Sequence, residues 1–345
     1  MTITKLAWRD LVPDTESYQE LFAQPELAKE HEFILSDTQP RLHYALEQVL
    51  SPWATAPFML LKAPEEAEYL TLLGDAVRQL KPEANAVFGG QYRIAGHDVT
   101  FEPAAQADGL FAAKGEVITA NWVEAEQLFG CLRQFNGELS LQPGLVHRAN
   151  GGVLIISLRT LLSQPLLWMR LKTIVHQQRF DWVGYDESRP LPVSVPSMPL
   201  SLTVVLTGDR ESLADFQEME PELAEQAVYS EYEDNTQIAD ADDMAQWCQW
   251  VMAVAERFAL PTPAADAWPG LIREAVRYTG DQETLPLCPL WIGKQLREVG
   301  VISGNGAFTG EQLTQMLAQR EWREGYLADR MQDEILLEQI LVETE

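Results

Sequence analysis

The stretch Gly151-Gly-Val-Leu-Ile-Ile-Ser157 decides the fold class of this chain, because four consecutive apolar residues follow a glycine pair. A run that is apolar throughout predicts a strand buried on both faces of a largely parallel sheet. Two further runs have the same character, Pro57-Phe-Met-Leu-Leu-Lys62 and Ser201-Leu-Thr-Val-Val-Leu-Thr-Gly208. Helical patterns separate these strands, so the sequence predicts an α/β three-layer sandwich with helices on both faces of the sheet.

Helices and short strands are expected around these buried strands. Helical patterns cover residues 40–50, 121–135 and 158–178, and another helix begins after the turn at 63–66. Glycine breakers divide residues 87–118 into short strands and turns. The proline-rich residues 179–199 are expected to form a hairpin between two buried strands.

The C-terminal third is predicted to be nearly all helical, over residues 245–258, 269–278, 289–299 and 310 onward. Trp247, Trp250 and Trp268 are expected in its core. The last segment, 310–345, predicts one helix of roughly 50 Å at about 1.5 Å per residue. Its apolar stripe needs a partner, which is the preceding helices, a further domain or a second subunit. We expect an N-terminal segment 1–56, an α/β domain 57–240, a helical lid 241–309 and a connector helix 310–345.

Composition excludes several classes of function. The 345 residues are 46% hydrophobic, enough for a sizeable core, and 52 acidic against 25 basic residues give a formal charge of -27. This balance argues against binding to nucleic acid or to an anionic membrane surface. The acids at 218–234 are expected to form a solvated helix face and loop. No apolar run approaches the roughly 20 residues of a membrane helix, and residues 1–13 have no apolar h-region, so we expect no secretory signal. Cys131, Cys248 and Cys288 lack metal-binding spacing, which favours a reducing cytoplasm.

One longer motif resembles a known family. Pro143-Gly-Leu-Val-His-Arg-Ala-Asn-Gly-Gly-Val-Leu-Ile-Ile-Ser157 is similar to the segment before and through Walker B in Lon-like ATP-dependent proteases of the archaeal, LonB-like type. Shorter stretches keep the same family order, from Ala125-Glu-Gln-Leu-Phe-Gly130 to Val204-Val-Leu-Thr-Gly-Asp-Arg210. The resemblance runs from about Phe58 to the C-terminus and is strongest to enterobacterial-type homologues. It implies an AAA+-like P-loop NTPase-type module that feeds a C-terminal Ser/Lys peptidase, usually as a hexameric ring.

The slot that matches the P-loop lacks the residues that hold phosphate. A working P-loop needs glycines, a lysine for the β- and γ-phosphates, and a Ser or Thr on magnesium. Glu68 stands near the lysine position and Tyr69 near the Ser/Thr position, and three carboxylates are expected to face a triphosphate. At an effective dielectric near 20, like charges about 4 Å apart repel by roughly 4 kcal/mol. We interpret the slot as vestigial; its residues are Ala63, Pro64, Glu65, Glu66, Ala67, Glu68 and Tyr69.

Three further positions depart from an active ATPase. The resemblance places Walker B at Ile155-Ile156-Ser157-Leu158, where Ser157 cannot replace a carboxylate as a base. Asp209 stands where active relatives often carry a polar sensor residue. No Lys or Arg occurs from Glu211 through Glu256, so an arginine finger is missing from that region. We therefore infer that the module does not hydrolyse ATP, and that ATP and magnesium are cofactors only if the family function is retained.

The peptidase half of the family is not recognisable in this sequence. Ser/Lys catalysis needs a serine on a tight glycine-containing turn and a neutral lysine beside it. The family's Gly-x-Ser-Ala-Gly type motif appears nowhere in the chain. The chain is thus expected to be a truncated form, a fragment, or one product of a split gene.

Four residues are candidates for contacts with other proteins. His147 and Arg148 precede the Walker B strand and are candidates for contacting a neighbouring subunit or nucleotide, against the alternative of local hydrogen bonding. Trp182 and Tyr185 are candidate aromatic grips for a peptide, against the alternative of an ordinary packed hairpin. No metal site is predicted.

The sequence therefore favours a substrate-recruiting or scaffolding module of a Lon-like ATP-dependent serine protease. Its expected partners are protein substrates, a Lon-type peptidase domain and copies of itself, with a hexamer as the family's usual ring. The alternative is a standalone protein-binding adaptor or chaperone-like ring protein. An active ATP-dependent protease, as the family implies, is the third class that remains open.

Overall fold

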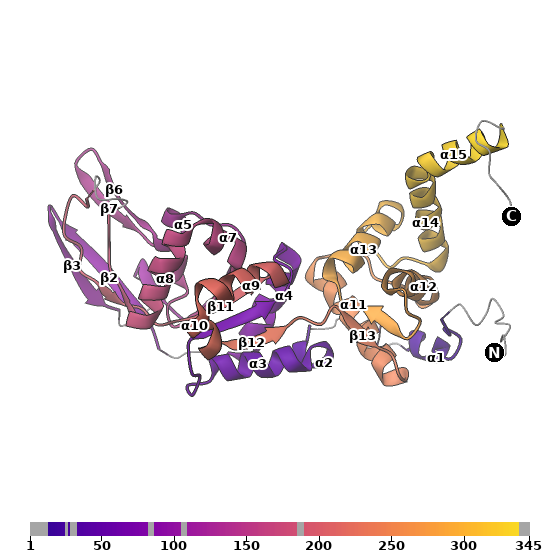
Figure 1. The fold of residues 1–345 in the computed structure, drawn as a ribbon, viewed down its shortest axis with the longest axis horizontal. Helices are drawn as coiled ribbons and strands as arrows, with labels where there is room; N and C mark the ends of the chain where they lie inside the picture. The colour runs from indigo at the N-terminus through magenta and orange to yellow at the C-terminus, as the bar shows by residue number, and fades with distance from the viewer. Residues whose placement is uncertain are drawn as a thin grey trace. The chain divides into compact units, whose positions relative to one another are not determined.

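The computed structural model describes residues 13–24, 27, 33–81, 86–104, 109–184 and 190–337. The chain divides into two compact units, Leu35–Tyr232, and Met1–Ile34 together with Glu233–Glu345 (Figure 1). These bounds differ from the expected ones because residues 1–56 are split between the units. Helix α3 (Pro40–Leu50) packs against strand β12 (Val228–Glu231) in the first unit. The ring of Phe22 stacks on Trp268 in the second, at 6.2 Å between centroids.

A five-stranded parallel sheet forms the centre of the first unit. Its strands lie in the order β12-β1-β11-β8-β5, and all four neighbouring pairs are parallel. Every residue of β8 is buried, as the uninterrupted apolar run predicts. The predicted α/β fold is confirmed; the remaining strand bounds are β1 (Phe58–Lys62), β5 (Val117–Ala120), β8 (Gly152–Ser157) and β11 (Leu202–Gly208).

The crossover helices cover both faces of this sheet. Helix α4 (Ala67–Leu80) connects β1 to β5 across two intervening strands, and it contacts β5 and β8. Helices α9 (Arg210–Met219) and α10 (Pro221–Gln226) connect β11 to β12 in the opposite direction, and α9 contacts β1 and β11. Because right-handed crossovers that run in opposite directions lie on opposite faces, α4 and α9 sandwich the sheet.

The glycine pair at the start of β8 permits a close approach by a second sheet and by the chain before β5. Strands β2 (Phe88–Ala95), β3 (Asp98–Pro103) and β4 (Phe111–Ala113) form an antiparallel sheet in the order β3-β2-β4. The backbone of Gly151 has φ +75°, and a Cβ there would overlap the ring of Phe88. A Cβ on Gly152 would overlap the carbonyl oxygen of Glu116. Only glycine therefore fits at these two positions without a shift of the backbone.

Two of the expected helices are interrupted. The prediction for 121–135 is wrong in its second half, because α5 (Ala125–Phe129) ends at Gly130, where φ is +72°. A hairpin of β6 (Cys131–Phe135) and β7 (Glu138–Gln142) follows, and its turn Asn136-Gly137 has positive φ at both residues. The helix expected over 158–178 is broken before Pro165 into α7 (Leu158–Ser163) and α8 (Pro165–Gln177).

The proline-rich excursion and the acidic stretch after it also contain strands. Strands β9 (Arg179–Phe180) and β10 (Met198–Pro199) pair antiparallel, which confirms the predicted hairpin. The prediction of a solvated helix face and loop over residues 218–234 is wrong in part, because β12 lies there as an edge strand of the central sheet. Only Ser230 of this edge strand is buried, so its sequence carries no apolar run that would predict a strand.

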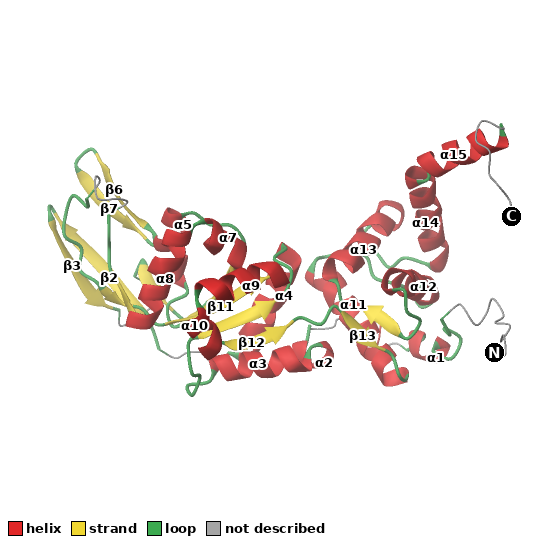
Figure 2. Cartoon of the chain, in the orientation of Figure 1, coloured by secondary structure: helices red, strands yellow, loops and turns green. Residues whose placement is uncertain are grey.

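The second unit is mostly helical (Figure 2). Its tryptophans are core residues as expected, with Trp247, Trp250 and Trp268 at 0%, 3% and 1% exposure. Across the part of the chain that the structure describes, no helix is both long and apolar enough to cross a membrane. The elements of this unit are α1 (Gln19–Phe22), α11 (Ala241–Arg257), α12 (Trp268–Thr279), α13 (Pro289–Ser303), α14 (Gly310–Glu324), α15 (Tyr326–Leu336), and the hairpin β13 (Asn235–Gln237) with β14 (Thr284–Pro286).

The prediction of a single long C-terminal helix is wrong. The helix is interrupted at Gly325, where α14 ends and α15 begins, and residues 338–345 lie outside the described residues. The apolar stripe is divided accordingly. Leu313 and Met316 of α14 are buried, whereas α15 buries no residue and leaves Leu327 78% exposed.

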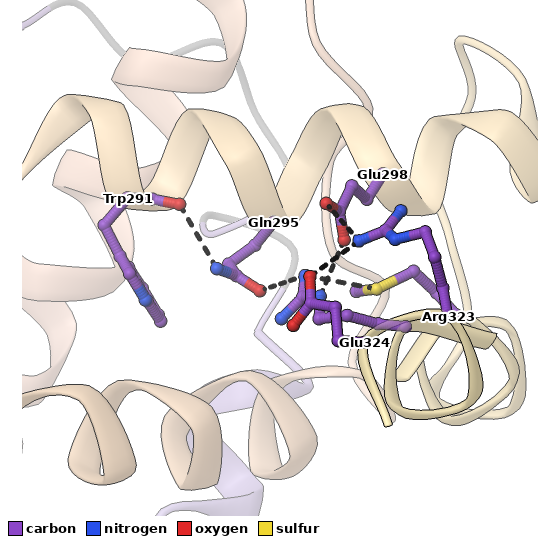
Figure 3. Close-up of polar contacts among 7 residues, drawn as sticks. Trp291, Gln295, Glu298, Arg323 and Glu324 are labelled. Atoms are coloured by element: carbon purple, nitrogen blue, oxygen red, sulfur yellow. Dashed lines mark hydrogen bonds and ion pairs between the residues drawn. The ribbon is translucent and has the colours of Figure 1, made fainter. Parts of the chain in front are cut away.

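A polar network fixes α14 on α13 (Figure 3). The Arg320 guanidinium donates from Nε to Glu298 at 2.7 Å and from Nη2 to the side-chain oxygen of Gln295 at 2.7 Å. Gln295 is 3% exposed, and its amide also donates to the Trp291 carbonyl at 3.4 Å. Arg323 adds a second contact to Glu298, at 3.4 Å. The network therefore satisfies polar groups that packing has largely removed from water.

We expect Arg320→Ala to loosen the contact between α13 and α14, because it leaves Gln295 with an unpaired buried oxygen. Such a loss costs about 1–3 kcal/mol. The matched control is Arg330→Ala, whose exposed pair with Glu334 spans 3.4 Å and is expected to change stability by less than about 0.5 kcal/mol. Hydrogen exchange of the α13 and α14 amides measures both effects. Equal exchange in the two variants would contradict the structural role given to Arg320.

Candidate functional site

The predicted nucleotide slot lies where α/β sheets commonly bind ligands. Residues 63–66 connect the carboxyl end of β1 to the start of α4, and the Ala63 amide donates to the Gly208 carbonyl of β11 at 3.1 Å. The connections from β1 and β11 leave in opposite directions, so the sheet has a topological switch between these strands. Ligands of open α/β sheets bind outside the carboxyl ends of the strands at such a switch. The structure thus brings the expected Walker A, Walker B and sensor positions to one edge of the sheet.

A buried carboxylate joins the first two of these positions. Glu65 is 9% exposed, and its Oε1 accepts a hydrogen bond from the Ser157 hydroxyl at 2.6 Å. The same oxygen accepts from the backbone N–H of Arg159 at 3.2 Å, within the first turn of α7. The other oxygen, Oε2, pairs with Arg159 Nε at 3.2 Å. Glu65 therefore caps α7 and bridges the ends of β1 and β8 through charge-assisted hydrogen bonds.

Arg159 extends this network to the sensor position. Its Nη2 lies 3.8 Å from Asp209 Oδ2, and Asp209 caps α9 by accepting from the Ser212 amide at 2.7 Å. The hydrogen bonds from Ser212 and the nearby Arg159 charge lower the pKa of Asp209. Arg159 is a residue that sequence reasoning missed, although it stands two positions after Ser157.

The other slot residues do not share the environment of Glu65. Glu66 is exposed and precedes the first residue of α4, so Glu65 is the one buried carboxylate of the three. Tyr69 is 2% exposed, and its ring packs edge-on against Tyr232 at 5.1 Å between centroids. The Tyr69 side chain thus belongs to the core. Pro64 and Glu68 are half-buried, and Ala67 is exposed.

The Walker B positions are all buried, and the Ser157 hydroxyl is the polar side-chain group among them. Ile155, Ile156 and Leu158 are all 0% exposed. Within the described ranges, no three His, Cys, Asp or Glu side chains gather in a way that could hold a metal ion. The polar contacts described at this edge are hydrogen bonds and ion pairs among the chain's own residues.

His147 and Trp182, which are far apart in the sequence, meet in one aromatic cluster. Their rings stack at 5.5 Å with an interplanar angle of 17°, and Phe180 lies 4.2 Å from the imidazole. His147 is 1% exposed, and its Nδ1 accepts from the Gly144 amide at 3.0 Å. This burial does not suit a contact with another subunit.

The remaining contact candidates have different environments. Trp182 is 9% exposed and donates from its indole to the Tyr92 hydroxyl at 3.0 Å. Tyr185 lies outside the described residues. Arg148 is exposed and lines a cavity with three other cationic side chains, which the sequence did not single out: Arg78, Lys81 and Lys114.

Burial of His147 predicts acid-dependent loss of stability. Desolvation, with a smaller effect of the Arg170 charge, lowers the pKa of His147 from 6.5 to about 3. Below pH 6.5 the unfolded chain therefore binds a proton that the folded chain rejects. The stabilisation is fully present above pH 6.5 and is lost as the pH falls toward 3, by up to about 1.4 kcal/mol per pH unit.

We expect His147→Asn, which keeps an acceptor for Gly144 but does not titrate, to flatten the fall in unfolding free energy between pH 6.5 and 4. Denaturant titrations at several pH values measure this slope. His97→Asn, on an exposed turn between β2 and β3, is the matched control and is expected to leave the slope unchanged. Parallel curves for the wild type and His147→Asn would refute the buried neutral imidazole.

Comparisons with known proteins agree with the geometry of this sheet. Residues 114–227 match the family model described as "LonB-like, AAA domain". The whole chain is 66% identical to a protein of Escherichia coli (strain K12) described as a Lon protease homologue, and it covers 59% of that protein. Over 84% of the chain, a protein of Haemophilus influenzae with the same description is 32% identical, and 50% of its length is covered. The chain thus spans little more than half the length of these relatives.

Solved structures of NtrX from Brucella abortus are more distant. One, in complex with ATP, has a TM-score of 0.45 at 13% identity over 95% of this chain and 67% of its own. Another has a TM-score of 0.43 at 12% identity over 86% of this chain and 56% of its own. The family model and the parallel sheet with its helical C-terminal part assign the fold. Residues 114–227 of this chain thus form a LonB-like AAA domain, and the chain as a whole is similar to the Lon protease homologues of these two bacteria.

Proposed function

We propose that this chain is a substrate-recruiting or scaffolding AAA+-like module of a Lon-like ATP-dependent serine protease, and that it does not hydrolyse ATP. The observation that carries the second part is the Glu65–Ser157–Arg159 network at the edge of the sheet where nucleotide would bind. The first part rests on the family to which the AAA domain belongs.

The network opposes binding of a triphosphate on charge grounds. A P-loop offers backbone N–H groups and a lysine, whereas this slot offers a buried carboxylate and no lysine. A like charge about 4 Å away costs roughly 4 kcal/mol at an effective dielectric near 20. Arg159, the cation that contacts Glu65, is paired with it at 3.2 Å. Nucleotide would have to break that pair and leave Glu65 buried with its charge uncompensated.

The same contacts leave no group for hydrolysis. Ser157 donates a hydrogen bond to Glu65, and a serine hydroxyl cannot serve as the carboxylate base that activates water. Asp209 is engaged as the cap of α9. The polar groups at this edge therefore hold β1, α7 and α9 together, and the module keeps the shape of the AAA domain without its chemistry.

We expect ATP with magnesium to leave hydrogen exchange of residues 63–70 and 157–160 unchanged, and the chain to release no phosphate above the blank. Hydrogen exchange is measured residue by residue because it distinguishes nucleotide bound at the slot from nucleotide bound at another surface of the chain. Protection confined to these two segments, or phosphate release that Arg159→Ala changes, would overturn the proposed loss of ATPase function.

Proteolysis is proposed to depend on residues beyond this sequence. The chain spans 59% and 50% of its two relatives, and the family's Gly-x-Ser-Ala-Gly type motif does not occur in it. A Lon-type peptidase domain, carried on a longer form of the chain or on a second polypeptide, would supply the nucleophile. The partners of the present chain are then protein substrates in the cytoplasm, that peptidase, and other copies of the same module.

Exposed apolar residues on α15 support the proposed self-association. Trp322 at the end of α14 is 80% exposed, and Leu327 and Met331 of α15 are 78% and 60% exposed. Leu327, Met331 and Ile335 follow one another at a spacing of four residues, so they lie on one face of the helix. An apolar helical face of this kind is stable in water when another surface covers it.

We expect sedimentation velocity to reveal concentration-dependent association of the chain, and Leu327→Asp to shift the distribution toward monomer. Asp329→Asn, which changes a charge on the same helix without changing this apolar face, is the matched control and should associate like the wild type. A wild-type chain that stays monomeric at about 100 μM would argue against a ring held by this helix, because association at that Kd is worth only about 5.5 kcal/mol.

A further inference from the structure

A cationic cavity lies in the first unit, at the opposite edge of the central sheet from the predicted nucleotide slot. Its volume is about 570 Å³, within the size range of small-molecule pockets. Three segments build it: the C-terminal end of α4, residues 114–119 before and within β5, and α6 (Leu145–Arg148). Its lining includes the cations Arg78, Lys81, Lys114 and Arg148, with Glu116 as the acid.

Two of the four cations are fixed by the protein itself. Arg78 pairs with Asp75 at 2.6 Å and donates to the Val117 carbonyl at 3.3 Å. Lys81 donates to the carbonyl oxygen of Gly115, and burial lowers the pKa of Lys81. Gly115 has φ +74°, and a Cβ there would meet the Lys81 ammonium. The glycine therefore makes room for a lysine that is held against the backbone.

The other two cations are not held by contacts of this kind. Lys114 and Arg148 are exposed, and among the described residues neither has a hydrogen-bond or ion-pair partner. Arg78 and Lys81 stand at the C-terminal end of α4, where positive charge is favourable to the helix dipole. That explanation does not extend to Lys114, which lies in no helix, and Arg148 ends α6, a single turn with a small dipole.

A cluster of four cationic side chains is unexpected in a chain of this composition. The formal charge is -27, and only 25 residues are basic. Four of those 25 line one cavity that contains a single carboxylate of its own. Exposed cations close together repel one another, so this arrangement is disfavoured unless an anion compensates it.

We propose that this cavity binds a small anion with two or more negative charges, carried by phosphate or carboxylate groups. Lys114 and Arg148 would contact the anion directly, while Arg78 and Lys81 form the positive wall behind it. The cavity is distinct from the nucleotide slot, since α4 starts at one and ends at the other. Its 14 residues span about 20 Å at 1.5 Å per residue.

Calorimetric titration of the full chain tests the proposal, with tripolyphosphate and citrate as separate probes at low ionic strength. We expect at least one of them to bind. Arg148→Gln and Lys114→Gln should each weaken binding about tenfold, the effect of one charge-assisted hydrogen bond. The matched control is Arg93→Gln, which removes one exposed positive charge from β2 outside the cavity. Because Lys114 and Arg148 are exposed, both variants are expected to fold.

The two probes separate the sources of the anionic group. Binding of tripolyphosphate alone identifies a phosphate compound, and binding of citrate alone a polycarboxylate. Binding of both identifies a site that recognises charge. Absence of binding by either probe, or affinities that Arg148→Gln and Arg93→Gln change equally, would overturn the proposal. Neither result bears on residues 63–70, so the proposed loss of ATPase function would stand or fall separately.

Discussion

The buried Glu65 carboxylate constrains the whole carboxyl edge of the central sheet. It reaches from the end of β1 past the intervening strand β11 to Ser157 and to the first turn of α7. A carboxylate that is 9% exposed needs several donors, and here they come from a hydroxyl, a backbone amide and a guanidinium. Removing one partner would leave charge in a poorly solvated place. At the edge where many α/β proteins bind ligands, Glu65 thus links the ends of β1 and β8 to the start of α7.

The central architecture was predictable because its signal is local and strong. Fully buried strands must be apolar throughout, so β1, β8 and β11 could be identified from short runs. Strand β12 could not, since an edge strand with one buried residue has no such run. The ends of three helices were predicted wrongly, because one glycine or proline interrupts a helix although the apolar periodicity continues, as at Gly130, Pro165 and Gly325. The backbone conformation at these residues decides where each helix ends, and the spacing of apolar residues carries no information about it.

The site was predictable in position but only partly in its contacts. The family resemblance placed Glu65 in the P-loop slot, Ser157 at Walker B and Asp209 at the sensor position. The parallel register of the strands brings these three positions to one edge of the sheet. Nothing in the sequence indicated that Arg159 would join them, because the contact depends on where α7 starts after β8. The pairing of His147 with Trp182 and the clustering of Lys114 with Arg148 likewise depend on segments far apart in the chain. Long-range contacts of this kind follow from the topology.

The glycine pair at 151–152 has a consequence for how the family motif should be understood. Its two missing side chains make room for the Phe88 ring and for the Glu116 carbonyl, both of which belong to the protein itself. The penalty for placing an alanine at either position is therefore steric, and it is the same whether or not any nucleotide is bound. These two glycines can therefore be retained for packing alone, independently of any phosphate chemistry at the other edge of the sheet.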